Sequence, residues 1–208
     1  MALTKSTTEI DAWEEIDTGG LREGAAADVS DSYGAMLHID CCPCEAGAHT
    51  GTEIIVQIGT DTSDADDNWS NLTRYVCCVG TIIVQALGQE EAAGQTVLTM
   101  AGDVGTANMD NNKKFKFLED ATDANSEIVY QVSESGNDIT ILDALVHTHA
   151  TTTSILCDID SATAEAVSMQ QVAVPAAADR VRVLYNNNYD ADGMAVFTRC
   201  RISKLTGV

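Results

Sequence analysis

Seven cysteines are the residues of this sequence with the most obvious chemistry. They fall into a Cys-Cys-Pro-Cys run, an adjacent pair and two single positions: Cys41, Cys42, Cys44, Cys77, Cys78, Cys157 and Cys200. A structural zinc site normally uses two C-x2-C knuckles, or one knuckle with a pair of histidines. Only Cys41 and Cys44 have the C-x2-C spacing. All seven cysteines are therefore disulfide candidates, with small buried thiols as one alternative and a metal site as another.

The Cys77-Cys78 pair allows a prediction of where its two side chains point. Adjacent residues of a strand point to opposite faces, so we expect at most one of the two thiols to face a core. An odd number of cysteines leaves at least one unpaired thiol or a bridge to another chain. Disulfides remain possible without a secretory signal, because thiols of a particle that matures outside the cell can oxidise late.

Two acidic loops offer the oxygen ligands that calcium prefers. Residues 61–68 hold four carboxylates, among them Asp64 and Asp66. Asn188, Asp190 and Asp192 stand at alternate positions of a second loop, with Gly193 sixth as in a calcium loop. The twelfth position there is Arg199 and not the required glutamate, which excludes an EF-hand. Hairpin turns explain both loops, with Ca²⁺ as a weak alternative and no other cofactor expected.

Modification and catalysis complete the list of possible sites. Asn68 and Asn71 begin consecutive N-glycosylation sequons, which would be used in a secreted protein. His147 and His149 share a spacing that metals use, yet a third ligand is not evident nearby, and a polar loop edge explains them better. The serines lack a nucleophile-elbow context and no glycine-rich phosphate loop precedes a helix. We therefore expect no catalytic residues and no enzyme.

Composition limits the partners. The 208 residues include 32 acidic and 11 basic side chains, giving a formal charge of −21. Such a chain repels nucleic-acid phosphates and anionic lipid surfaces. Apolar runs are far shorter than the ~20 residues that span a bilayer, and the first residues lack an apolar signal core. We expect a soluble protein that binds neither nucleic acid nor membrane.

The elements that must position these residues are mostly strands. Short runs rich in Val, Ile and Thr alternate with Gly, Asn and Asp, which is typical of strands and turns. The runs predict strands over residues 35–42, 53–59, 72–79, 81–87, 96–100, 114–118, 127–133, 138–142, 154–159, 164–174, 180–185 and 194–204. Residues 135–138 (Ser-Gly-Asn-Asp) predict a hairpin turn, because Gly and Asn tolerate positive φ.

This spacing favours an all-β fold, a jelly-roll-like β-sandwich with an inserted small β-barrel-like domain. We expect an N-terminal arm over residues 1–34, a sandwich from residues 35–87 and 154–208, and the insert over residues 88–153.

Charge asymmetry suggests a way to assemble. Residues 1–112 hold three basic and nineteen acidic side chains, whereas five basic residues follow residue 179. Arg180, Arg182, Arg199 and Arg201 alternate with apolar residues and could dock on the acidic surface of another copy. The alternative is a solvated face paired with neighbouring carboxylates. We also expect the arm, with Ile10 and Trp13 as anchors, to contact a neighbouring copy.

Several segments resemble proteins of tailed-phage particles: EIVYQVSESGNDITI (127–141), LVHTHA (145–150), MALTKSTTEI (1–10) and GTEIIVQI (51–58). This resemblance implies a non-enzymatic, self-assembling component of a virion, either a head-decoration or a tail subunit. Its partners would be copies of itself and a major capsid or tail protein. A subunit of a secreted, pilus-like extracellular fibre assembled by strand exchange is the second hypothesis. A carbohydrate-binding sandwich is the third, although few aromatic residues are available as platforms.

Overall fold

The computed structural model describes residues 3–17, 19–43, 45–49, 51–61, 68–105, 109, 115–151, 154–160, 167–187 and 195–207. This part of the chain is built almost entirely from antiparallel β-strands, with a short 3₁₀ turn η2 (Asp123–Asn125) and no α-helix. The predicted all-β class and the β-sandwich are confirmed. None of the described helical turns has the length and apolar character needed to cross a membrane.

A four-stranded sheet forms one layer of the sandwich. Its strands lie in the order β1 (Leu3–Ile16), β16 (Val196–Gly207), β4 (Gly34–Pro43) and β14 (Ser168–Val174), all antiparallel. Because side chains alternate along a strand, β4 turns Leu37, Ile39 and Cys41 inward and His38 outward.

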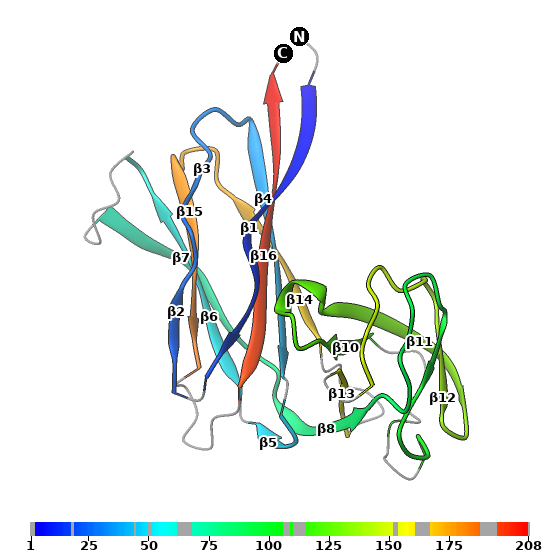
Figure 1. Ribbon diagram of the computed structural model, residues 1–208. Coiled ribbons are helices and arrows are strands. Elements are labelled where there is room, and N and C mark those ends of the chain that lie inside the picture. Colours follow the sequence, from blue (N-terminus) through cyan, green and yellow to red (C-terminus); the bar gives the residue numbers. More distant parts are fainter. Residues whose placement is uncertain are drawn as a thin grey trace.

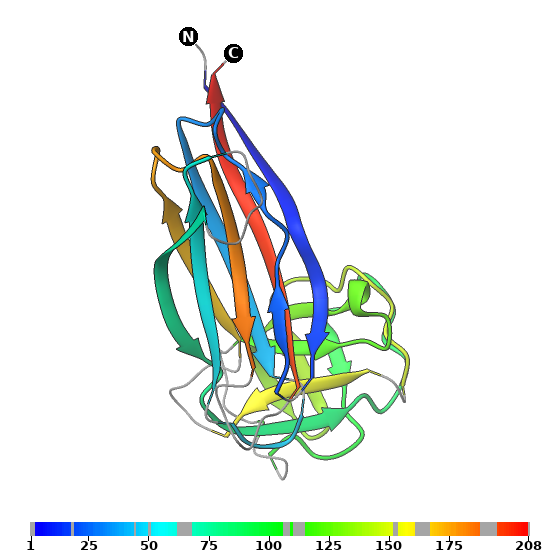
Figure 2. The ribbon, with the colours of Figure 1, turned by 90° about the vertical axis from the view of Figure 1, so that its left-hand side faces the viewer.

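A five-stranded sheet forms the other layer. Its strands lie in the order β2 (Leu21–Glu23), β15 (Arg180–Asn186), β6 (Thr52–Gly59) and β7 (Trp69–Cys77), and the short β3 (Ala27–Asp28) also pairs with β15. β15 turns Val181, Val183 and Tyr185 into the core. Apolar side chains of both sheets interdigitate there, and each fully buried one contributes about 1.5–3 kcal/mol. Figure 2 shows the two layers along their long strands.

A seven-stranded sheet lies beside one end of the sandwich (Figure 1). Its order is β5 (Gly47–His49), β8 (Gly80–Ala86), β13 (Ile155–Ile159), β10 (Phe115–Glu119), β11 (Glu127–Ser135), β12 (Asp138–Ile141) and β9 (Val97–Thr99). The hairpin predicted at residues 135–138 is confirmed: Ser135 pairs with Asp138, and Gly136 has φ 63°.

The arrangement of the strands differs from the sequence expectation in three places. β8 and β13, expected in the sandwich, pair with the strands of the insert. The seven described strands form an open order with β5 and β9 at its ends, so the expected barrel closure is not seen among them. Residues 3–16, expected to be an arm, form β1 and pair with β16 along almost its whole length. These outcomes depend on long-range pairing, which local alternation does not encode.

Aromatic side chains join the insert to the sandwich. Phe117 of β10 lies 5.0 Å from Trp13 of β1 and 5.3 Å from Phe197 of β16, measured between ring centroids. All three side chains are buried, together with Cys42 and Cys157. The insert is therefore packed against the outer face of the four-stranded sheet.

Candidate functional site

The four arginines expected to dock on another copy have carboxylate partners in their own chain. Arg199 Nη2 lies 2.7 Å, and Arg201 Nη2 3.1 Å, from the buried Asp40 Oδ2. Arg180 lies 3.6 Å from an Asp61 oxygen, and Arg182 pairs with Glu23.

Arg180 and Arg182 belong to β15, whereas Arg199 and Arg201 belong to β16, so the two pairs lie on the outer faces of different sheets. The expected single cationic face is therefore replaced by two separate sets of intramolecular ion pairs.

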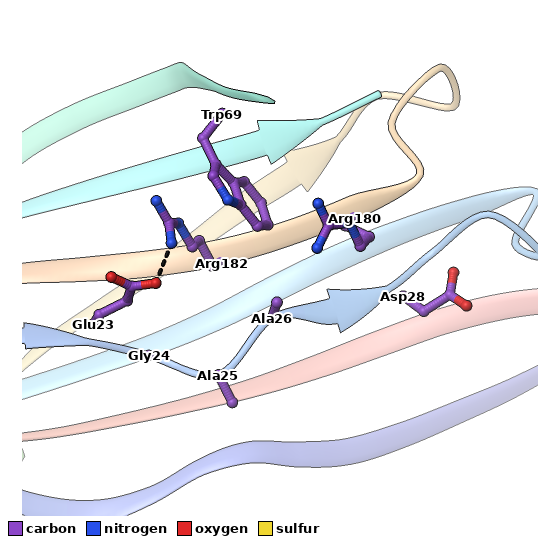
Figure 3. A pocket seen from close by; sticks show the side chains of 8 residues that line it. All are labelled: Glu23, Gly24, Ala25, Ala26, Asp28, Trp69, Arg180 and Arg182. Atoms are coloured by element: carbon purple, nitrogen blue, oxygen red, sulfur yellow. Dashed lines mark hydrogen bonds and ion pairs between the residues drawn. The ribbon is translucent and has the colours of Figure 1, made fainter. Parts of the chain in front are cut away.

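A pocket of about 590 Å³ surrounds the β15 arginines on the outer face of the five-stranded sheet. Trp69 of β7 stands in it between Arg180 and Arg182, with Glu23 opposite, as Figure 3 shows. The guanidinium carbons lie 4.7 Å and 4.3 Å from the Trp69 ring centroid. Gly59 of β6 pairs with Arg180 on one side and with Trp69 on the other. Because glycine has no side chain, the Arg180 and Trp69 side chains come together over it.

This pocket does not offer an open aromatic platform. Its guanidinium groups stack on the indole, a cation–π contact worth about 0.5–2 kcal/mol. Gln57 Oε1 accepts from Arg182 Nε at 2.9 Å, and the Asp61 carbonyl accepts from Arg180 Nε at 2.8 Å. A sugar ring would have to displace an arginine to stack on Trp69. The arrangement therefore gives little support to the carbohydrate-binding hypothesis.

An open strand edge is a second feature of the sandwich. β14 and β7 are the edge strands on one side of the two sheets and lie close together there (Figure 2). A groove of about 460 Å³ runs between them, lined by Leu72, Thr73 and Tyr75 of β7 and by residues 170–173 of β14. Leu72 and Tyr75 also pack on the sandwich core, so the groove gives access to apolar core side chains.

The composition of β14 is unusual for an edge. Its sequence, Ser-Met-Gln-Gln-Val-Ala-Val, contains no charge and no proline, in a protein with 21% charged residues. Natural proteins usually block an exposed edge with charges, proline or a bulge, because its free N–H and C=O groups can pair with another strand. Met169 of β14 (44% exposed) and Met36 of β4 (37%) are exposed apolar side chains near opposite ends of the β14–β4 pairing. Among the described strands, the outer edge of β14 is therefore left without a pairing strand and without a charged block.

The histidine pair expected at a loop edge is divided between two environments. His149 is fully buried between two carboxylates, with Nδ1 3.1 Å from Asp120 and Nε2 3.0 Å from Glu127. Ser154 Oγ donates to Asp120 at 2.9 Å and makes no contact with the imidazole that would activate it. His147 is partly exposed. The cluster therefore ties loops of the insert together and lacks an activated nucleophile.

The carboxylates of this cluster are held in their charged form. Burial by itself raises the pKa of Asp120, but hydrogen bonds from the Thr122 N–H, Ser154 and His149 outweigh burial and lower the pKa. Glu127 behaves in the same way, because His149 and two backbone N–H groups donate to it, so its pKa is lowered despite burial. Charge-assisted hydrogen bonds of this kind are stronger than neutral ones.

The described cysteines are buried and reduced: Cys41, Cys42, Cys77, Cys78, Cys157 and Cys200. None of these six forms a disulfide in the structure, and Cys44 lies outside the described residues. Burial raises the pKa of the Cys42 and Cys157 thiols well above the ordinary value. Cys77 differs, because hydrogen bonds from the Cys41 and Cys78 thiols lower its pKa.

The expectation that Cys77 and Cys78 point to opposite faces is wrong. The two residues are only 5% and 6% exposed, and both belong to the sandwich core. β7 ends at Cys77, and Cys78 has φ 60°, the left-handed conformation, which no other described non-glycine residue adopts. This conformation costs a non-glycine residue roughly 1–2 kcal/mol. It turns the chain so that the rule of alternation no longer applies.

The predicted calcium ligands and glycosylation sites are the remaining candidates. The weak calcium ligands Asn188, Asp190, Asp192, Asp64 and Asp66 lie outside the described residues. Asn68 is partly buried, and Asn71 is exposed with its Oδ1 accepting from Gln57 at 2.9 Å.

Both expected assembly anchors pack within their own chain. Ile10 packs on the sandwich core, and Trp13 is 6% exposed against Phe117, beneath Arg199. The expected contact of these two residues with a neighbouring copy is corrected accordingly, because pairing of β1 with β16 carries both side chains into the protein's own interior.

Sequence reasoning missed two features, His49 and the β14 edge. His49 follows the Cys-Cys-Pro-Cys run by five residues, a spacing that could have been read as part of a ligand set. For β14, the run of uncharged residues was visible, but its position at an edge depends on the sheet order.

Comparisons with known proteins give only distant likenesses. The chain matches no protein family and no curated protein. Among solved structures, the K3 adhesin domain of Lys-gingipain from Porphyromonas gingivalis W83 is 9% identical, with a TM-score of 0.37 over 95% of this chain and 72% of that one. The tailspike of Acinetobacter baumannii bacteriophage AP22 is 13% identical, with a TM-score of 0.29 over 44% of this chain and 15% of that one. The capsid protein VP17 of bacteriophage P23-77 is 10% identical, with a TM-score of 0.19 over the full length of both chains.

Proposed function

We propose that this protein is a structural, self-assembling subunit of a phage-like virion, either a capsid-decoration or a tail component. The observation that carries the proposal is the uncharged, open edge of β14 beside the groove to β7. A strand of a neighbouring copy added there would gain main-chain hydrogen bonds and place alternate side chains against Leu72 and Tyr75. Copies of the chain are its partners, and the virion is its location.

The neighbouring strand is taken to be β14 of a second copy. Two identical edge strands can pair antiparallel about a two-fold axis, which joins two four-stranded sheets into one continuous sheet. The remaining surface is strongly acidic, with a formal charge of −21, and like charge opposes close approach elsewhere. Association is therefore directed to the edge that lacks charge.

Lysines on the edge test this proposal. Gln170 and Gln171 are exposed on β14, and replacing both in a Gln170→Lys/Gln171→Lys variant sets like charges against each other across the two-fold axis. Like charges opposed across an interface cost several kcal/mol, so we expect at least a tenfold loss of assembly. Light scattering coupled to size exclusion measures the dimer formed through β14, and circular dichroism checks that the fold is kept.

The matched control adds the same charge to an interior strand. Ser133 and Ser135 are exposed on β11, which has β10 and β12 on either side. A Ser133→Lys/Ser135→Lys variant should assemble like the wild type. Equal assembly of the edge variant and the wild type would refute the role of β14. Electron microscopy of wild-type assemblies tests the wider proposal: shells or tail tubes support a virion subunit, whereas free filaments support the secreted fibre.

A further inference from the structure

Three thiols from separate parts of the chain meet in the sandwich core. Cys41 comes from β4, Cys77 ends β7 and Cys78 follows it, and their three Sγ atoms all lie within 4.8 Å of one another. The Cys78 and Cys41 sulfurs are 3.6 Å apart. Two thiolates bound to one zinc ion at about 2.3 Å in tetrahedral geometry lie about 3.8 Å apart. The Cys41 and Cys78 sulfurs therefore already have the spacing of thiolate ligands, and the Cys77 sulfur lies within 4.8 Å of both.

The backbone around the cluster is arranged to bring these sulfurs together. The left-handed conformation at Cys78 lets two adjacent cysteines serve one site, which an extended strand forbids. Gly51, with φ 119°, allows close approach here, because a Cβ on it would lie 2.9 Å from the Cys77 carbonyl oxygen. Apolar packing alone would not require a strained residue, and strained residues concentrate at functional sites.

A buried histidine lies near the cluster, although its ring nitrogens are not within 4.8 Å of all three sulfurs. His49 is 2% exposed, and its Nδ1 lies 2.5 Å from the Cys78 carbonyl oxygen. A carbonyl only accepts, so Nδ1 donates in this contact and Nε2 is the ring nitrogen left for a metal. Nε2 is buried and has no hydrogen-bond partner within the described part of the protein. Metal-binding histidines typically donate their second ring N–H to a carbonyl or carboxylate in this way.

We propose that Cys41, Cys77 and Cys78 bind a structural zinc ion, with His49 as the fourth ligand once its Nε2 moves closer to the three sulfurs. Three thiolates and an imidazole are the ligand set that Zn²⁺ prefers in closed structural sites, and the cluster is buried in the core with no need for an open position. The sequence offers one C-x2-C knuckle, Cys41 and Cys44, but the proposed site takes only Cys41 from it and combines this residue with the adjacent Cys77-Cys78 pair. The ion would link β4 of one sheet to β7 of the other.

Metal analysis of the full-length protein tests the site directly. Protein purified under reducing conditions should contain one zinc per chain by mass spectrometry. Replacing zinc with Co²⁺ should give the intense near-ultraviolet band of thiolate-bound, tetrahedral cobalt. These measurements use the wild-type chain, so their outcome does not depend on whether a variant folds. A chain without zinc that gives no thiolate–cobalt band would overturn the proposal, as would a mass two hydrogens lower that reveals a Cys41–Cys78 disulfide.

Variants assign the ligands. Cys41→Ala and Cys77→Ala should each weaken cobalt binding at least a hundredfold. The matched control is Cys200→Ala, since Cys200 is buried in the same core but lies outside the cluster, and it should bind cobalt like the wild type. His49→Ala should keep the thiolate band but weaken binding at least tenfold. Unchanged cobalt affinity in His49→Ala would show that His49 is not a ligand. Loss of cobalt binding in Cys200→Ala would contradict the assignment of the three thiols.

Discussion

At the scale of single residues, burial and neighbouring charge decide how side chains behave. The arginines of β15 and β16 illustrate this, because each finds a carboxylate of its own chain instead of a partner molecule. Lys116 and Asp158, both fully buried in the insert, form another such pair. Removing one member of a buried pair typically costs 3–5 kcal/mol, since the other charge is left buried alone. The net charge of −21 therefore says little about any single charged group.

Glu119 is the residue with the clearest dependence on pH. Burial raises its pKa from 4.5 to about 7, and the carboxylates of Glu15, Asp123 and Glu45 add to the effect. An acid with a raised folded-state pKa favours folding when protonated. Its contribution is complete below pH 4.5 and is lost as the pH rises through about 7.

We therefore expect Glu119→Gln to raise the melting temperature at pH 8 and to leave it unchanged at pH 4.5. The gain should be roughly 2–4 °C, which corresponds to ~1 kcal/mol of stability in a protein of this size. It is no larger because Glu119 is partly exposed, and solvent screens its charge. Thermal unfolding followed by circular dichroism at both pH values measures it. Glu90→Gln is the control, since Glu90 is exposed, and it should change neither value. A gain of equal size at both pH values would contradict the account given for Glu119.

At the scale of elements, sheet position decides what a strand does. β1 and β14 are the two edges of one sheet, yet they differ in composition: β1 carries Lys5 and several acidic residues, whereas β14 carries no charge. The charged edge is protected from pairing and the uncharged one is open. For this reason the proposed assembly contact lies at β14 and not in the N-terminal segment.

Truncation separates the two halves of β1. Residues 3–9 are exposed, whereas Trp13 and Ile16 are buried. Deleting residues 1–16 should lower the free energy of unfolding by more than ~3 kcal/mol, a typical cost of losing a buried tryptophan. Deleting residues 1–8 should cost far less. Urea titration followed by circular dichroism measures both, because the shorter deletion keeps Trp13 and the longer one removes it. A stable, folded chain without residues 1–16 would show that the segment is a separate arm after all.

At the scale of the whole molecule, the sandwich and the insert share one aromatic contact region. Phe117 of the insert touches Trp13 and Phe197 of the sandwich, and its side chain is fully buried. Such a contact couples the unfolding of two parts that each have a core of their own. The coupling would hold the insert in a fixed position on the sandwich.

Phe117→Ala tests this coupling. Removing the ring should cost about 3–5 kcal/mol and divide one calorimetric unfolding transition into two. Leu118→Ala is the matched control, because Leu118 is equally buried on the same strand but packs inside the insert. This control should unfold at a lower temperature in a single transition. One transition in both variants would mean that other contacts couple the two parts.

Local pattern by itself determined the class of this protein and the places of most strands. The signals that predict them act over only a few residues, so the sequence alone shows them. They are the β-branched residues, the alternation of apolar and polar side chains, and the Gly-Asn turn between β11 and β12. Only the tertiary structure decided which strands share a sheet, that β8 and β13 belong with the insert, and that residues 3–16 pair with β16. It also decided that Cys77 and Cys78 meet Cys41 beside His49. The physical reason is that these outcomes depend on partners 29 to 204 residues away, as for His49 with Cys78 and Leu3 with Gly207, and on one left-handed residue just after β7. A local pattern specifies neither.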